Sequence, residues 1–169
     1  MIVPVYKKEK TITKDLKRIY QVIQKLRYPT ELICVIDGKV DRSFEKASKF
    51  KLFHERVEFI QGSAASSEIV ETLTRRVKGK KVLITLDSKH SKENALNEIK
   101  QYAPLVSRDS YLVVQDTHVD GYPNVPDFGP GPYEAMQEFL KTDENFVIDR
   151  SREKFLLTFY PSGYLKRIK

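Results

Sequence analysis

Two aspartates follow apolar runs that are typical of buried strands. Asp87 ends the run VLITLD, and Asp116 ends the run YLVVQD, in which Gln115 precedes it. Because neighbouring parallel strands end at the same edge of a sheet, we expect these side chains to converge there. Carboxylate oxygens suit a hard divalent cation such as Mg²⁺, and Gln115 offers a third, neutral oxygen if it points the same way. The alternative, which stays open, is that both aspartates only cap the turns or helices that follow them.

A histidine stands close to the first of these aspartates. His90 lies three residues after Asp87, in the segment LDSKHS. Imidazole titrates near neutral pH, so His90 is a candidate catalytic base or a group that polarises a substrate hydroxyl. A lone surface histidine before a helix cap is as often inert, and that alternative also stays open. His54 and His118 have no such context, and no Cys/His pair has the spacing of a zinc site.

Other polar positions follow the remaining expected strands. Asp37, in ICVIDG, would suit the two hydroxyls of a ribose, or it is simply the turn aspartate of an Asp-Gly pair. Tyr6 ends the first run, and Gly62 and Ser63 end the third. Ligands of parallel α/β sheets bind at this edge. We therefore predict a ligand site formed by these strand ends.

Alternating apolar runs and amphipathic segments must position these residues. We expect strands at 2–5, 32–36, 57–60, 82–86 and 111–114, and helices at 13–27, 41–51, 66–77, 91–102 and 133–140. This alternation predicts an α/β fold with a mostly parallel sheet wrapped on both faces. Two last strands, at 146–148 and 155–159, are expected to form a hairpin. The long polar loop from 117 to 131 is expected to be functional.

The turn after the first strand contains no glycine. It reads VPVYKKEKTITKDL, and Gly38 is the first glycine in the chain. A loop that cradles a dinucleotide, a phosphate or S-adenosylmethionine (SAM) is normally rich in glycine, because the backbone must approach the ligand closely. We therefore expect such a cofactor to bind poorly at this turn.

Length, cysteine content and charge narrow the class of protein. The 169 residues suit one domain, and no run of ~18 apolar residues predicts a membrane span. The single Cys34 excludes an internal disulfide and indicates a cytoplasmic location. Residues 1–80 carry 18 Lys/Arg and 10 Asp/Glu, whereas residues 81–169 carry 12 and 13. The basic half would attract nucleic acid, but no nucleic-acid motif accompanies it, so a solvated helix face is favoured.

From about Val57 to its end, the chain resembles the cephalosporin hydroxylase / rhamnosyl O-methyltransferase family of SAM-dependent enzymes. The resemblance rests on motifs that occur in order: VEFIQGSAAS, KVLITLDSKHS, QYAPLVSRDSYLVVQDTHVDG, PDFGPGPYEAMQEFL and DRSREKFLLTFYPSGYLKRI. It implies a Rossmann-like three-layer αβα sandwich, mostly parallel with an antiparallel C-terminal strand. It also implies SAM as cofactor and a hydroxyl-bearing small molecule as acceptor.

The same resemblance implies roles for particular residues. A divalent metal such as Mg²⁺ would be held by Asp87 and by an acidic pair, which here reads Gln115-Asp116 with Gln115 in place of the usual glutamate. Gly62 and Ser63 would line the adenosine pocket. Residues 128–132 would lie over the acceptor.

The first fifty or so residues resemble a different family. The segment IVPVYKKEKTITKDLKRIYQVIQKLRYPTELICVIDGKVDRSFEKA is similar to the start of family 2 (GT-A) glycosyltransferases. That similarity implies that Tyr6 and Asp37 contact the nucleotide of a sugar donor. Together, the two resemblances divide a single domain into segments 1–53 and 54–169 and predict a chimera, engineered or natural.

Three functions follow from these patterns. The first is a SAM-dependent O-methyltransferase-like domain with a divalent-metal site, impaired or inactive because the glycine-rich loop is absent. The second is a chimeric scaffold with no activity. The third is a module that binds a nucleotide or a nucleotide sugar. We expect the first, without turnover in this chain.

Overall fold

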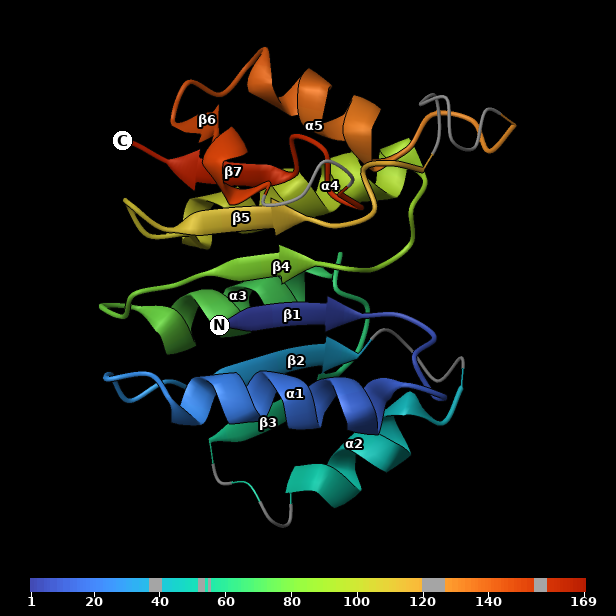
Figure 1. Ribbon diagram of the computed structural model, residues 1–169, viewed down its shortest axis with the longest axis vertical. Helices are drawn as coiled ribbons and strands as arrows, with labels where there is room; N and C mark the ends of the chain where they lie inside the picture. Colours follow the sequence, from blue (N-terminus) through green and yellow to red (C-terminus); the bar gives the residue numbers. More distant parts are fainter. Residues whose placement is uncertain (37–40, 52–53, 55, 120–126, 154–157) are drawn as a thin grey trace.

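A seven-stranded sheet runs through the part of the molecule that the structure describes, in the order β3-β2-β1-β4-β5-β7-β6 (Figure 1). The computed structural model describes the chain except for residues 37–40, 52–53, 55, 120–126 and 154–157. The strands are β1 (Ile2–Val5), β2 (Leu32–Ile36), β3 (Val57–Gln61), β4 (Ile84–Leu86), β5 (Tyr111–Val114), β6 (Phe146–Ile148) and β7 (Tyr164–Arg167). The helices are α1 (Ile12–Gln24), α2 (Ser43–Lys51), α3 (Ser67–Val77), α4 (Lys92–Tyr102) and α5 (Pro132–Leu140), with single 3₁₀ turns at Ala103–Leu105 and Arg150–Arg152.

The sheet is mostly parallel, as the alternation of strands and helices predicts. Strands β3, β2, β1, β4 and β5 pair in parallel, whereas β7 is antiparallel to both β5 and β6. The strands β1 and β2 lie between β3 and β4, so the two predicted segments, 1–53 and 54–169, share one continuous sheet. The expected fold class, a three-layer αβα sandwich with an antiparallel C-terminal strand, is therefore confirmed.

Two clusters of buried side chains hold helices to the two faces of the sheet. Helices α1 and α2 pack on β1, β2 and β3 through residues that include Leu16 and Phe50. Helices α3, α4 and α5 pack on the opposite face through residues that include Leu73, Ile99 and Met136. Among the described helices, none is long and apolar enough to cross a membrane.

The last strand lies later in the sequence than predicted. The expected strand at 155–159 is wrong for its described residues, 158 and 159, which form no strand, and residues 155–157 lie outside the described part of the chain. The strand that pairs with β5 is Tyr164–Arg167. Only Leu165 of this strand is fully buried, and two of its four residues are cationic, so its sequence resembles a solvated tail.

The predicted helix caps are only partly confirmed. Asp41 Oδ1 accepts a hydrogen bond from the amide of Ser43, the first residue of α2, at 2.9 Å. Ser66 and Ser91 stand at the N-cap positions of α3 and α4, but neither side chain makes a capping hydrogen bond. Packing on the sheet therefore matters more than capping for these two helices.

Gly163 allows the segment before β7 to pass close to β5. Its carbonyl oxygen accepts a hydrogen bond from the amide of Val114 at 2.8 Å. A Cβ atom at this position would overlap the carbonyl oxygen of Val114. Because Gln115 and Asp116 follow Val114 directly, this close approach fixes the backbone from which both side chains extend.

We expect the substitution Gly163→Ala to lower the free energy of unfolding by about 2 kcal/mol or more, because the overlap involves backbone that is unable to move aside. The matched control is Gly79→Ala. Gly79 has a φ of +76° and open space around it, so this variant has only the backbone strain of a side chain at positive φ, about 1 kcal/mol, and no steric overlap. Urea unfolding measures both, and equal losses would contradict the steric explanation.

Candidate active site

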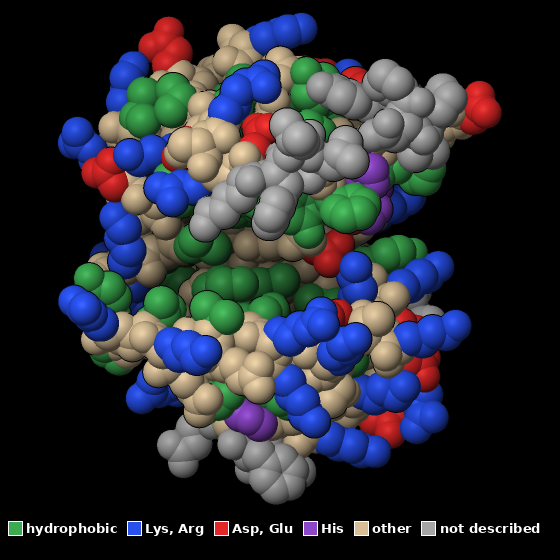
Figure 2. Space-filling model, viewed as in Figure 1, with side chains coloured by type: hydrophobic (Ala, Val, Ile, Leu, Met, Phe, Trp, Pro, Cys, Tyr) green, Lys and Arg blue, Asp and Glu red, His purple; other side chains and the backbone are tan. Residues whose placement is uncertain are grey.

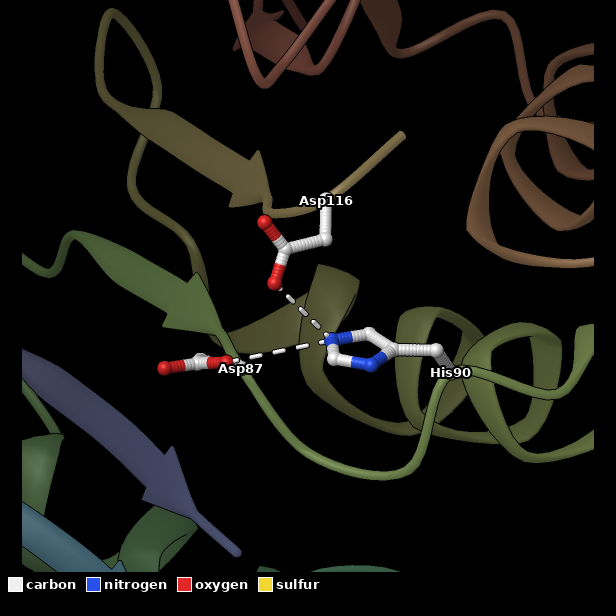
Figure 3. Close-up of side chains that lie close together, drawn as sticks. All are labelled: Asp87, His90 and Asp116. Atoms are coloured by element: carbon white, nitrogen blue, oxygen red, sulfur yellow. Dashed lines mark ion pairs between the residues drawn. The ribbon is translucent and has the colours of Figure 1, made fainter. Parts of the chain in front are cut away.

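Asp87, His90 and Asp116 converge at the edge of the sheet where β4 and β5 end (Figure 3). His90 Nε2 lies 3.1 Å from Asp116 Oδ2 and 3.8 Å from Asp87 Oδ1. One ligand atom from each of the three residues lies within 4.8 Å of the other two. The two carboxylates therefore meet as their positions after neighbouring strands predict, and His90 joins them.

Strand pairing and a sharp backbone turn place Asp116. Leu86 pairs with Val114, so the residues that follow β4 and β5 begin side by side. The amide of Gln115 extends this pairing by donating to the carbonyl oxygen of Leu86 at 3.1 Å. Asp116 then has a φ of 52°, in the left-handed region that aspartate visits more readily than most residues other than glycine. Backbone of this kind is concentrated at functional sites.

Helix α4 holds the loop that carries His90. Ser88 donates a hydrogen bond to Glu98 Oε2 at 2.5 Å, and Glu98 is only 2% exposed. Asn94 donates to both Ser88 Oγ and the carbonyl oxygen of Lys89, each at 3.1 Å. Sequence reasoning missed these residues. The one available signal was an acidic residue on the inward face of a helix.

Two buried atoms of the cluster have no hydrogen-bond partner among the described residues. They are Asp87 Oδ1 and His90 Nε2. The contact between His90 Nε2 and Asp116 is close, but it does not have the direction of a hydrogen bond. Buried polar atoms normally have partners, and a hard divalent cation is a partner that carboxylate oxygens suit. The donor set therefore fits a metal ion.

The close contact between His90 and Asp116 shifts the pKa of both side chains. The Asp116 carboxylate raises the pKa of His90, against the opposing effects of burial and of Lys8. The imidazole in turn lowers the pKa of Asp116, although burial acts in the other direction. The pH range over which both side chains are charged therefore extends further at both ends than it would for the separate groups.

Gln115 faces a cavity of about 260 Å³ that Asp87 also lines, between α1 and the strands β1 and β2. Apolar side chains line a hollow on this face of the molecule, and acidic and basic groups meet at one end of it (Figure 2). Gln115 Oε1 accepts a hydrogen bond from the hydroxyl of Tyr160 at 3.0 Å. Burial raises the pKa of Tyr160 to about 12, with Asp116 and Asp87 acting in the same direction. That Gln115 ligates a metal stays a prediction, and the contribution of Tyr160 was not foreseen.

Among the other predicted site residues, Tyr6, Gly62 and Ser63 follow strands that end at the same edge of the sheet. Tyr6 follows β1, and the ammonium of Lys7 lies 5.2 Å from the centroid of its ring. Gly62 and Ser63 follow β3, which β2 and β1 separate from β4. Gly62 has a φ of +152°, which favours glycine. Asp37 lies outside the described residues.

Two backbone amides of the turn after β1 are already bonded to side chains. The amide of Lys8 donates to Ser43 Oγ at 3.0 Å, and the amide of Glu9 donates to Asp41 Oδ2 at 3.2 Å. Side chains at and just before the start of α2 therefore occupy two amides of the kind that a glycine-rich loop would offer to a ligand. Lys7 makes the turn with a φ of 48°, a conformation in which glycine is the usual residue.

Replacing Asp116 by asparagine tests the ion pair through the pH dependence of stability. Because the pKa of His90 is raised, its contribution is complete below the ordinary histidine pKa and is lost as pH rises through the folded-state pKa. Because the pKa of Asp116 is lowered, its contribution is present above the ordinary aspartate pKa and is lost as pH falls through the folded-state pKa. At about pH 5.5, D116N should be less stable than the wild type by about 1 kcal/mol in urea unfolding.

Once the pH has risen through the raised pKa of His90, the imidazole is neutral and no longer offsets the repulsion between Asp87 and Asp116. D116N should then be as stable as the wild type, or more stable. The control is Glu144→Gln, since the side chain of Glu144 is 90% exposed and its ion pair with Lys169 involves no histidine. A loss in D116N that is equal below and above the pKa of His90 would show that the pair does not behave as described.

A family model described as Rhamnosyl O-methyltransferase/CmcI matches residues 18–168 of the chain. A rhamnosyl O-methyltransferase of Mycobacterium tuberculosis is 40% identical over 114 residues, which are 64% of this chain and 46% of that protein. The Mycobacterium leprae protein of the same name is 38% identical over 114 residues, covering 64% of this chain and 49% of that protein. The chain thus spans about half the length of the curated relatives it matches.

Solved structures support the same fold. The methyltransferase MycE from the mycinamycin biosynthetic pathway, in complex with Mg, SAH and mycinamycin VI, superposes with a TM-score of 0.64. It is 13% identical, and the match covers 99% of this chain and 44% of MycE. A protein from Corynebacterium glutamicum is 14% identical with a TM-score of 0.60, covering 99% of this chain and 71% of that protein. At this identity the similarity concerns the fold alone.

The extent of these matches bears on the predicted chimera. The family model begins at residue 18, so its match includes all of α2 and part of α1. These helices belong to the segment 1–53, which resembles a glycosyltransferase. One family therefore accounts for most of that segment, and the comparisons do not support a glycosyltransferase parent or an engineered origin.

Proposed function

The chain belongs to the Rhamnosyl O-methyltransferase/CmcI family, and from this premise we propose that it carries the cation- and acceptor-binding part of an O-methyl-transfer site. The observation that supports this most directly is the cluster of Asp87, His90 and Asp116, with its buried and unpartnered atoms. Because the chain spans about half of its curated relatives, the activity of the whole protein is part of the proposal. The continuous sheet supports a single unit over residues 1–169.

Asp87 and Asp116 are the proposed ligands of a divalent cation such as Mg²⁺, and Gln115 is the proposed third ligand. A cation bound here would polarise an acceptor hydroxyl and lower its pKa. Tyr160 donates to Gln115 Oε1, and a carbonyl oxygen keeps a second lone pair for another partner. The amide is neutral, so it binds a cation more weakly than a glutamate would.

His90, in its neutral form, is the proposed base that receives the proton of the acceptor hydroxyl at Nε2. The neighbouring carboxylates raise the pKa of the imidazole, which makes it a stronger base. Ser88, Asn94 and Glu98 hold the loop in place, so the imidazole is positioned before an acceptor arrives.

The proposed acceptor is a small molecule that carries a hydroxyl, and the name of the curated relatives suggests a sugar hydroxyl. The amide of Lys92 donates to the carbonyl oxygen of Pro130 at 3.0 Å, which ties residues 128–132 to the helix that follows His90. Phe128 is 55% exposed and offers an apolar ring for an acceptor to contact.

The family uses SAM as its methyl donor, and we propose that this chain binds SAM weakly. Two amides after β1, those of Lys8 and Glu9, already donate to Ser43 and Asp41, which leaves fewer backbone donors for a ligand at this turn. Tyr6, Asp37, Gly62 and Ser63 remain the proposed contacts at the strand ends. When bound, SAM would supply the methyl group that the acceptor oxygen receives.

Mn²⁺ binding, followed by electron paramagnetic resonance of the free ion, tests the metal site. We expect Asp87→Asn to lower the affinity about tenfold or more, because a carboxylate ligand is lost. We expect Gln115→Glu to raise it about tenfold, because a neutral ligand gains a charge. The control is Glu144→Gln, far from the cluster on the side of β6.

An unchanged affinity in D87N would refute the site, and an unchanged affinity in Q115E would remove Gln115 from it. Pulsed measurements on bound Mn²⁺ add a second readout. A nitrogen coupling that disappears in His90→Gln would make His90 a metal ligand instead of the base.

Calorimetric titration with SAM and with its demethylated product SAH tests the cofactor side. We expect dissociation constants weaker than about 100 μM, with or without Mg²⁺. Saturable binding in the low micromolar range would contradict weakened cofactor binding. Titration with UDP is the matched control, because binding that requires Asp37 would instead favour a nucleotide-sugar module.

A further inference from the structure

A lysine reaches the acidic cluster from a third strand. Lys8 follows β1, which lies beside β4, and Val5 forms an isolated parallel bridge with Asp87. The Nζ atom of Lys8 lies 3.0 Å from Asp87 Oδ2, and the two side chains are 36% and 16% exposed. Lys8 also lines the cavity that Asp87 and Gln115 share.

The main chain of Lys8 is held on both sides. Its amide donates to Ser43 Oγ at 3.0 Å, and Ser43 is fully buried. Its carbonyl oxygen accepts hydrogen bonds from the amides of Thr11 and Ile12, at 3.0 and 2.8 Å, where α1 begins. The ammonium is therefore directed at Asp87 from a fixed backbone, unlike that of a lysine on an open surface.

The two carboxylate oxygens of Asp87 face different groups. Oδ2 contacts the ammonium of Lys8, whereas Oδ1 faces His90 and has no hydrogen-bond partner among the described residues. The charge of Lys8 also acts on His90 and Asp116, where it favours a lower pKa for each, so its field covers the whole cluster. A divalent cation entering the cluster meets a positive charge that is already in place.

We propose that Lys8 determines the cation affinity of this site, acting as an internal counter-ion that a divalent cation must displace from Asp87 or tolerate beside it. The inference rests on the proposed function, because it concerns the same cluster. In the absence of metal, Lys8 and His90 both contact the carboxylates, Lys8 at Asp87 and His90 beside Asp116. The site should therefore take up a cation only when the cation is abundant.

The test is Mn²⁺ affinity in Lys8→Met, measured by paramagnetic resonance on the full chain. We expect K8M to bind Mn²⁺ about tenfold more tightly than the wild type or better, because a unit charge a few ångströms from the ion is removed. Lys8→Arg keeps the charge and should keep wild-type affinity. Lys7→Met is the matched control, since the ammonium of Lys7 lies over the ring of Tyr6. It should also leave the affinity unchanged.

Each outcome separates this inference from the metal site itself. If K8M binds Mn²⁺ no better than the wild type while D87N binds it less well, the metal site stands and the inference about Lys8 is wrong. If neither the wild type nor K8M binds Mn²⁺, the site and the inference both fail. The Mn²⁺ affinity of Lys8→Gln is measured in parallel, and thermal unfolding shows which variants are folded. If K8M does not fold, the affinity of K8Q decides the result.

Discussion

Two carboxylates forced together at one edge of the sheet are the constraint on which the rest of this site depends. Because β4 pairs with β5, Asp87 and Asp116 lie side by side just beyond the ends of these strands. Like charges at this separation repel, and the repulsion is strong where the groups are partly buried. Two basic side chains offset this repulsion. His90 lies beside Asp116, and Lys8 lies beside Asp87.

This compensation connects the stability of the fold to its chemistry. A divalent cation would satisfy the same oxygens that His90 and Lys8 now contact, so ligand and protein compete for them. His90 loses its positive charge as pH rises through its raised pKa. The basic side chains that balance the two carboxylates would therefore also affect how readily the cluster accepts a cation.

The residues of the site that could be predicted from the sequence are those whose positions are determined by the ends of strands. Asp87 and Asp116 were predictable because a buried parallel strand is a continuous apolar run, and its end is visible in the sequence. Lys8 was not, since nothing local distinguishes it from Lys7 in the segment YKKEK. Glu98 and Tyr160 act through contacts with residues distant in the chain, and β7 was hidden by its cationic residues.

The fold and the cofactor cradle are separable in this chain, and the turn after β1 shows why. The sheet requires only that β1 lie between β2 and β4. The buried apolar residues of β1 and α1 hold β1 there, and this does not depend on the residues of the turn. A cofactor cradle needs free backbone amides with no side chains in the way. Here the amides of Lys8 and Glu9 donate to Ser43 and Asp41, at and just before the start of α2. These bonds also fix the backbone of Lys8 and so direct its ammonium at Asp87. The same short turn therefore both engages two backbone amides and places an ammonium beside Asp87.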